Sequence, residues 1–278
     1  MQAELFFSYD TLQSNASRVR DIYRWLNYSI NASSDLGLYL KAVDVAMALK
    51  VDVAAIPDHL QTTTLKAMRV MNLILEADPL QDSDVMLLWR IAKKSLEHGK
   101  SKSSIGLDAA WELDMLTHVR FRGITAKIAE PDIKVVIADM EYSIACKRVN
   151  VETGLENLIE DGCEQLARHG AGVIAINLDI LADDPAPLDF DYFIDGERHG
   201  QRLIDNFLLT QREKLYEYIE KHDNLDGFLL SVSCATRIKE SHADLDLCTA
   251  SRYLDNPNGV SYTAVSRFRI FYEAMRRN

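Results

Sequence analysis

Apolar residues recur every three to four positions through the first hundred residues, which is the spacing of one face of a helix. Within residues 10–30, this face holds Leu12, Val19, Ile22, Tyr23, Leu26 and Ile30. Further helices are expected over 42–50 and 62–75, and a fourth from an N-cap at Ser83 to Gly99. The pattern predicts an all-helical N-terminal region over residues 1–100, which ends in the Ser- and Lys-rich stretch GKSKSSIG.

The pattern changes from about residue 105. A helix is expected over 106–119, a strand within 119–128, and strands over 131–137 and 140–147, where apolar residues alternate. The next helix would begin at a capping box of Thr153 and Glu156 and end at Gly170, before the apolar strand 171–178. Beyond an acidic loop, a helix over about 196–221, an apolar strand over 225–233 and a helix over 265–277 complete the chain. This order predicts an α/β domain over residues 105–278.

Composition narrows the classes of protein that this chain can represent. Its 278 residues and 47% hydrophobic content suffice for one large domain or two modest ones. A formal net charge of -11 opposes a broad, sequence-independent attraction to nucleic acid, although it allows a local basic groove. The four cysteines are far apart and form no CxxC pair, which disfavours a zinc site or a disulfide framework.

The termini and apolar runs predict a compartment. The N-terminal sequence lacks the basic start and apolar run of a signal peptide. No apolar run approaches the roughly 20 residues that span a bilayer. A cytoplasmic protein that does not enter a membrane is the expectation.

Two strands carry residue types that suit phosphodiester chemistry. Asp132 begins the strand 131–137, and Lys147 ends the strand 140–147. Cleavage of a phosphodiester needs an activated water and neutralised phosphate oxygens, which a hard cation held by carboxylates can provide. A nearby lysine can orient the water or stabilise developing negative charge. Each residue alone also suits an ordinary role, as a strand start or a solvated strand end.

Several motifs occur in a characteristic order on elements of suitable type. They are Glu112 in the helical WELDML, Pro131 and Asp132 in EPDI, Lys147 in IACKR, Gln165 in EQL, and the strand GVIAINL. Over about residues 105–181 this pattern resembles the PD-(D/E)XK nuclease-like superfamily, and most of all its compact members with a preceding helical segment. The resemblance implies a restriction-endonuclease-like core, in which a mixed sheet is flanked by helices.

The resemblance also implies residue roles. Asp132 would bind Mg²⁺ or Mn²⁺, Glu112 would be a direct or supporting ligand, Lys147 would be the catalytic lysine, and Gln165 would position water or substrate. The superfamily has an acid two residues before the lysine, whereas this chain has Ala145. Glu141 lies on the same strand face as Lys147 but about 13 Å from it along an extended strand. An acid relocated to the next helix, Glu160 or Glu164, is therefore the better substitute for the missing carboxylate.

Three functional hypotheses remain open. The first is a metal-dependent nuclease acting on DNA or RNA. The second is a catalytically inactive nuclease-like module that binds nucleic acid or a protein partner, with Ala145 marking the lost site. The third, compatible with either, is self-association through the helical N-terminal region. Arg120, Arg122 and Arg148 are candidate contacts to nucleic acid.

Overall fold

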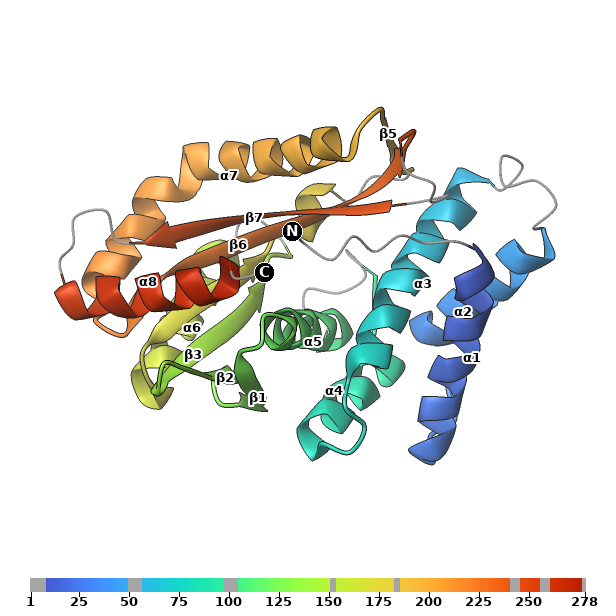
Figure 1. Cartoon of the computed structure of the whole chain (residues 1–278), viewed down its shortest axis with the longest axis horizontal. Helices are drawn as coiled ribbons and strands as arrows, with labels where there is room; N and C mark the ends of the chain where they lie inside the picture. Colours follow the sequence, from blue (N-terminus) through green and yellow to red (C-terminus); the bar gives the residue numbers. More distant parts are fainter. Residues whose placement is uncertain are drawn as a thin grey trace. The chain divides into compact units, whose positions relative to one another are not determined.

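The computed structural model describes residues 9–49, 57–97, 105–150, 154–182, 186–240, 246–255 and 261–276. Figure 1 shows the chain, with labels on most of its helices and strands. Within the described residues there are eight α-helices and one seven-stranded mixed sheet. The α/β class and the helical character of the N-terminal region are as the sequence predicted. None of the described helices combines the length and the apolar composition needed to cross a bilayer.

Each predicted helix overlaps one in the structure. The ranges are α1 (Tyr9–Trp25), α2 (Asp35–Ala48), α3 (Asp58–Glu76), α4 (Asp82–Lys93), α5 (Ile105–Phe121), α6 (Leu155–His169), α7 (Phe193–Lys221) and α8 (Tyr262–Arg276). However, α1 ends at Trp25 rather than near residue 30, and α2 begins at Asp35 rather than at residue 42. The predicted N-cap of α4 is wrong, because Gln81 occupies the cap position and Ser83 lies inside the first turn. Gly99 and Thr153 lie outside the described residues. Gly170 follows α6 with a φ of 115°, a conformation that favours glycine.

The seven strands include two that the pattern did not reveal. They are β1 (Thr125–Ala129), β2 (Asp132–Ile137), β3 (Met140–Arg148), β4 (Gly172–Asn177), β5 (Leu188–Phe190), β6 (Leu225–Ile238) and β7 (Asp246–Asp255). Their order is β1-β2-β3-β4-β6-β5, with β7 also paired to β6. The first three strands are antiparallel neighbours, whereas β4 runs parallel to both β3 and β6. The unpredicted strands are β5, inside the expected acidic loop, and β7.

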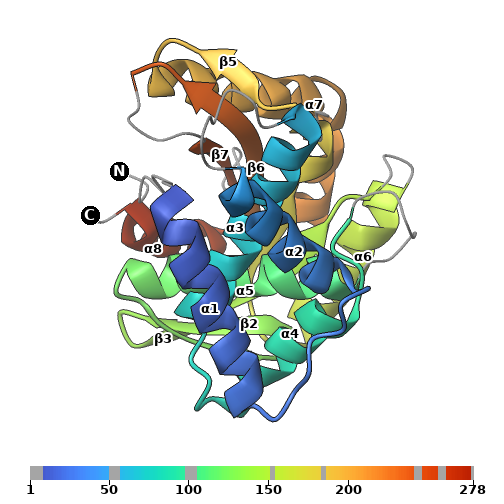
Figure 2. The same ribbon diagram turned by 90° about the vertical axis from the view of Figure 1, so that its right-hand side faces the viewer.

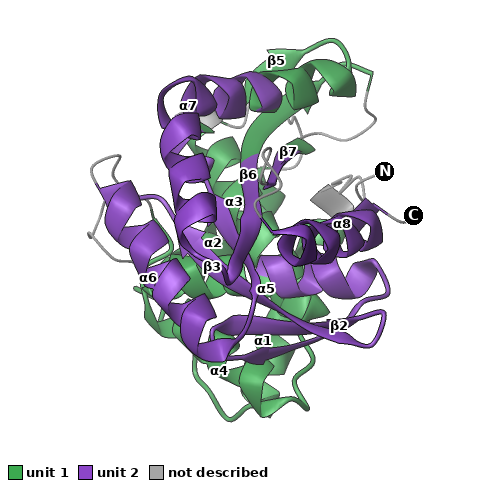
Figure 3. Ribbon diagram, turned by 90° about the vertical axis from the view of Figure 1, so that its left-hand side faces the viewer, with its two compact units in different colours: residues 1–113, 182–200, 233–249 green, residues 114–181, 201–232, 250–278 purple. Residues whose placement is uncertain are grey.

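The chain forms two compact units, which Figure 3 colours separately. Unit 1 comprises Met1–Leu113, Ala182–Gly200 and Ser233–Thr249, and unit 2 comprises Asp114–Leu181, Gln201–Val232 and Ala250–Asn278. Helices α5 and α7 and strands β6 and β7 each contribute residues to both units. The division into regions 1–100 and 105–278 stays a prediction.

In unit 1, helices α1, α2 and α3 contact one another in pairs, and α4 contacts α2 (Figure 2). The fully buried Tyr23 of α1 donates its hydroxyl hydrogen bond to the carbonyl of Leu88 in α4, at 2.8 Å. Asp35, at the start of α2, accepts hydrogen bonds from the Ser95 hydroxyl and the Leu96 amide, both at 2.8 Å. These polar groups therefore pair with partners from other parts of the helical region.

In unit 2, α6 contacts β3 and β4, whereas α8 contacts β2 and β4. Side chains alternate between the two faces of a strand. Tyr142 of β3 packs against Phe271 of α8, with ring centroids 5.3 Å apart. Lys147, five residues further along β3, therefore points to the other face and reaches α6. The two helices cover opposite faces of the sheet.

Candidate active site on the helix-covered face of strands β2 and β3

The pairing of β2 with β3 positions Asp132. Ile133 lies opposite Ile144, so Asp132 comes next, opposite Ala145. The Cys146 amide donates a hydrogen bond of 2.7 Å to the Asp132 carboxylate. Opposed residues of an antiparallel pair share a face, and Lys147 lies two residues beyond Ala145 on that same face. The strands thus place the acid and the lysine beside each other, as the sequence predicted.

Helix α6 contributes the remaining polar groups. The Lys147 ammonium donates hydrogen bonds to the carboxylate of Asp161 at 2.5 Å and to the side-chain oxygen of Gln165 at 2.7 Å. Asp161 and Gln165 are four residues apart, so they lie one above the other on one helix face. The Lys147 side chain is 9% exposed and that of Asp161 is 60% exposed. The pair therefore joins a buried lysine to a solvent-accessible carboxylate.

Gly162 allows α6 to approach the sheet closely. A Cβ atom at this position would lie 2.8 Å from the Cδ1 atom of Ile174 and 3.4 Å from the Cε atom of Lys147. The first distance is too short for two carbon atoms. A larger residue at 162 would push α6 away from the sheet, and with it Asp161 and Gln165.

The Asp132 carboxyl group has a strongly perturbed pKa. Burial raises the pKa from 3.8 to about 6, against the lowering effects of the Cys146 amide and the Lys147 charge. The negative charges of Glu130 and Asp161 raise it further. A buried carboxyl group that lies near other negative charges and has a raised pKa is a feature of functional sites.

This shift predicts how Asp132 affects the stability of the metal-free protein. A raised pKa in the folded state stabilises the protonated form, so its contribution is complete below pH 3.8 and is lost as the pH rises through about 6. We expect Asp132→Asn, which stays neutral and can still accept from the Cys146 amide, to melt at a higher temperature than wild type at pH 8. At pH 3.5, below the ordinary value of 3.8, the two should melt nearly together. Thermal unfolding in EDTA at both pH values measures the difference, and equal melting temperatures at pH 8 would contradict the expected charge penalty.

The structure brings some of the predicted site residues together and separates others. Asp132, Lys147 and Gln165 come together, but the two relocated acids proposed from the sequence point elsewhere. Glu160 accepts a hydrogen bond from the Tyr218 hydroxyl of α7 at 3.3 Å, and Glu164 pairs with Arg168 at 2.8 Å. The ammonium group of Lys147 instead donates to Asp161 and Gln165. Asp161 is thus the acid on α6 that the sequence interpretation missed.

Glu112 belongs to unit 1. Its carboxylate lies 3.7 Å from the Arg90 guanidinium, and its side chain is 14% exposed. Its role as a metal ligand stays a prediction. The described residues contain no cluster of three or more His, Cys, Asp and Glu side chains arranged to hold a metal ion.

The predicted nucleic-acid contacts are partly engaged within the fold. Arg148 is 5% exposed, and its position next to Lys147 directs it to the other face of β3. Arg120 donates a hydrogen bond from Nε to the carbonyl of Ala126 at 3.3 Å. Arg122 lies within 6.0 Å of the Phe121 ring. Their contact with nucleic acid stays a prediction.

The donor set near Lys147 suits a hard cation. Asp132 and Asp161 are carboxylates that interact electrostatically with each other, and Mg²⁺ is commonly held by one or two carboxylates with water and phosphate completing its shell. A divalent cation would also favour the ionised form of Asp132, whose pKa is raised mainly by burial and further by the nearby negative charges. Two carboxylates beside a lysine therefore fit the predicted Mg²⁺ or Mn²⁺ site without a third protein ligand.

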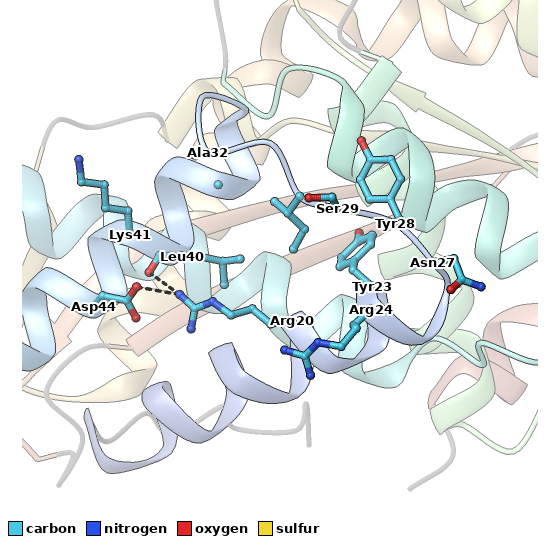
Figure 4. Close-up of a pocket in the computed structure, with 12 residues that line it drawn as sticks. Arg20, Tyr23, Arg24, Asn27, Tyr28, Ser29, Ala32, Leu40, Lys41 and Asp44 are labelled. Atoms are coloured by element: carbon cyan, nitrogen blue, oxygen red, sulfur yellow. Dashed lines mark hydrogen bonds and ion pairs between the residues drawn. The ribbon is translucent and has the colours of Figure 1, made fainter.

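A separate pocket lies in unit 1, between α1, α2 and the segment that joins them (Figure 4). Its volume is about 650 Å³, and Tyr23, Tyr28 and Lys41 are among its lining residues. Within it, Arg20 pairs with Asp44 at 2.8 Å. None of its lining residues belongs to the Lys147 site.

Comparisons with protein-family models, with curated proteins and with solved structures gave no match. The functional argument therefore depends on the geometry around Lys147.

Proposed function

We propose that the chain is a divalent-metal-dependent nuclease with a restriction-endonuclease-like core, which cleaves phosphodiester bonds in DNA or RNA. The element order supports this proposal. Helix α5, the antiparallel strands β1, β2 and β3, helix α6 and the parallel strand β4 follow one another as the resemblance implied. Because a fold alone does not establish activity, the proposal depends on the site.

The observation that carries the proposal is the contact of Lys147 with Asp161 and Gln165, beside Asp132. Asp161 supplies the second carboxylate that Ala145 leaves missing from β3. It does so from α6, which packs directly over that strand. Asp161 would therefore compensate for the alanine at position 145, and the site would still have two carboxylates beside the lysine.

Each residue has a chemical task in this site. Asp132 and Asp161 would hold Mg²⁺ or Mn²⁺, which when bound would act as a Lewis acid on the phosphate and lower the pKa of a water. Lys147 would neutralise a phosphate oxygen or orient the attacking water, with its ammonium group positioned by Gln165. The Lys147 side chain is buried, and its aliphatic stem lies beside Gly162 of α6, which helps to hold it in place.

The inactive module is the second candidate, and one contact favours it. The Lys147 Nζ atom lies 2.5 Å from an Asp161 carboxylate oxygen, so the negative charge of Asp161 already balances the positive charge of the lysine. If this pair persisted when metal and substrate were supplied, Lys147 would be a structural residue and the chain would bind without cleaving. Metal binding and cleavage distinguish the two candidates.

Metal binding should raise the melting temperature of the chain. At 100 times its dissociation constant, a ligand stabilises the folded state by about 2.7 kcal/mol. We expect Mg²⁺ or Mn²⁺ to raise the melting temperature by several degrees in wild type and to have no such effect in Asp132→Ala. Glu164→Ala, which alters an exposed acid paired with Arg168, is the matched control and should respond like wild type.

The same preparations are incubated with double-stranded DNA, single-stranded DNA and single-stranded RNA, in Mg²⁺, Mn²⁺ or EDTA. Metal-dependent cleavage supports the nuclease. A chain that binds metal through Asp132 but cuts none of these substrates would favour the inactive module.

A further inference from the structure

Unit 2 contains a second cavity, of about 960 Å³, between α8, β7 and the unit 2 part of α7. We call it the α8 groove. Phe268 is buried, whereas Tyr253 and Tyr272 are half-buried, so both phenol rings keep surface toward the groove. Their ring centroids are 5.0 Å apart at an interplanar angle of 75°. Arg276 lies over the Tyr272 ring, 5.2 Å from its centroid, and donates a hydrogen bond to the Tyr272 hydroxyl at 2.7 Å. The groove thus offers the aromatic surface that Arg276 and the packing of the two rings leave uncovered.

The charges along the α8 groove balance. Arg252 and Asp255 line it from β7, and Arg269 and Glu273 line it from α8. Arg252 pairs with Asp205 at 2.7 Å, and Arg269 pairs with Glu273 at 2.9 Å. A phosphate backbone, which requires excess positive charge, is therefore a poor match. The groove instead presents donors and acceptors side by side.

We propose that the α8 groove binds an unpaired nucleobase. A base is planar and uncharged, and its face stacks on tyrosine rings. Its edge carries both acceptors, which arginine can meet, and amino donors, which carboxylates can meet. Stacking surface together with balanced charge fits this chemistry better than it fits a purely apolar or a purely anionic ligand.

This inference does not depend on the proposed nuclease activity. The Lys147 site faces α6, whereas α8 covers the opposite face of the sheet. The base could belong to a free nucleoside or to a single strand. The experiment therefore includes both sources.

Binding is measured by fluorescence anisotropy with labelled oligo(dA) and oligo(dT) of about 12 nucleotides, a length within the usual range of single-strand sites. The full chain is used in EDTA, so that metal-dependent cleavage cannot occur. Unlabelled adenosine is added as competitor. Competition by adenosine would identify the base alone as sufficient, whereas binding of the oligonucleotides without it would assign the base to a strand.

Substitutions in α8 locate the contact. Tyr272→Ala is expected to weaken binding about 10-fold, because one stacking surface is lost, whereas Tyr272→Phe should stay within about twofold. Tyr262→Ala is the matched control, because Tyr262 lies on the same helix, is 87% exposed and is not part of the groove.

Salt dependence gives an independent criterion. With a balanced groove, the logarithm of the affinity should fall with the logarithm of the salt concentration at a slope of about 2 or less. No binding of either oligonucleotide or adenosine by wild type would overturn the proposal. Equal losses of affinity in Tyr262→Ala and Tyr272→Ala would also overturn it. So would a much steeper salt dependence, which would indicate that binding releases many ions.

Discussion

Asp161→Ala is expected to lower metal-dependent cleavage about 100-fold or more, a loss typical of removing one charged group from a catalytic centre. Asp161 is the acid of α6 that contacts Lys147, and in the proposed site it would take the place of the carboxylate missing at Ala145. Lys147→Ala should cause a loss of similar size. Initial rates on the best substrate, at saturating metal, measure both variants.

The neighbouring acids of α6 provide matched controls. Glu160→Ala and Glu164→Ala remove carboxylates from the same helix that contact Tyr218 and Arg168 instead. Both should keep cleavage within about twofold of wild type, as expected for exposed polar groups outside a site. Asp161→Ala also leaves the buried Lys147 ammonium without its carboxylate partner, so some loss of stability is expected and the rates are compared well below the melting temperature of the variant. Full activity in Asp161→Ala, or equal losses in all three variants, would exclude Asp161 as the second carboxylate.

The position of Asp161 shows what the sequence reveals about this site and what it does not. The alternation of β3 correctly predicted the face that Lys147 shares with Ala145, because strand periodicity is local. The acid on α6 depends on how that helix rotates over the sheet, which is decided by Gly162 packing against Ile174. A usable signal existed, since a residue four positions before Gln165 shares its helix face. Glu160 and Glu164, chosen because they lie on the same helix as Gln165, do not share that face.

The two unpredicted strands have a different cause. Strand β5 has three residues and pairs with the end of β6, so its pairing depends on residues almost fifty positions away. Strand β7 contains Asp246, Arg252 and Asp255 among its ten residues, and this charge obscures the alternation. In contrast, β4 and α6 were predictable because each has a clear local pattern of apolar residues that does not depend on distant parts of the chain.

Arg267→Met is expected to destabilise unit 2 by about 3–5 kcal/mol at pH 8, the usual cost of removing one partner of a buried ion pair. Arg267 of α8 donates to both oxygens of Asp226 in β6, at 2.6 and 2.9 Å. The Asp226 side chain is fully buried. Without the guanidinium, α8 would cover an uncompensated charge.

The control for this change is Arg269→Met on the same helix. Arg269 is 78% exposed and pairs with Glu273, so its loss should cost less than about 1 kcal/mol. Urea unfolding followed by circular dichroism measures both variants. Equal costs for the two substitutions would show that the Asp226 pair contributes no more than a surface contact.

The pH dependence of the Arg267→Met variant follows from the charge of Asp226. Burial raises the pKa of Asp226, and the Arg267 hydrogen bonds and charge oppose that rise. Removing Arg267 should raise the pKa further, so the variant keeps its stability below the ordinary value of 3.8 and loses it as the pH rises through the raised pKa. The difference from wild type should therefore be smaller at pH 5 than at pH 8. Adding Asp226→Asn to Arg267→Met should recover part of the loss at pH 8, because the buried group is then neutral. A difference from wild type that does not vary with pH would show that lost packing, rather than the uncompensated carboxylate, destabilises the variant.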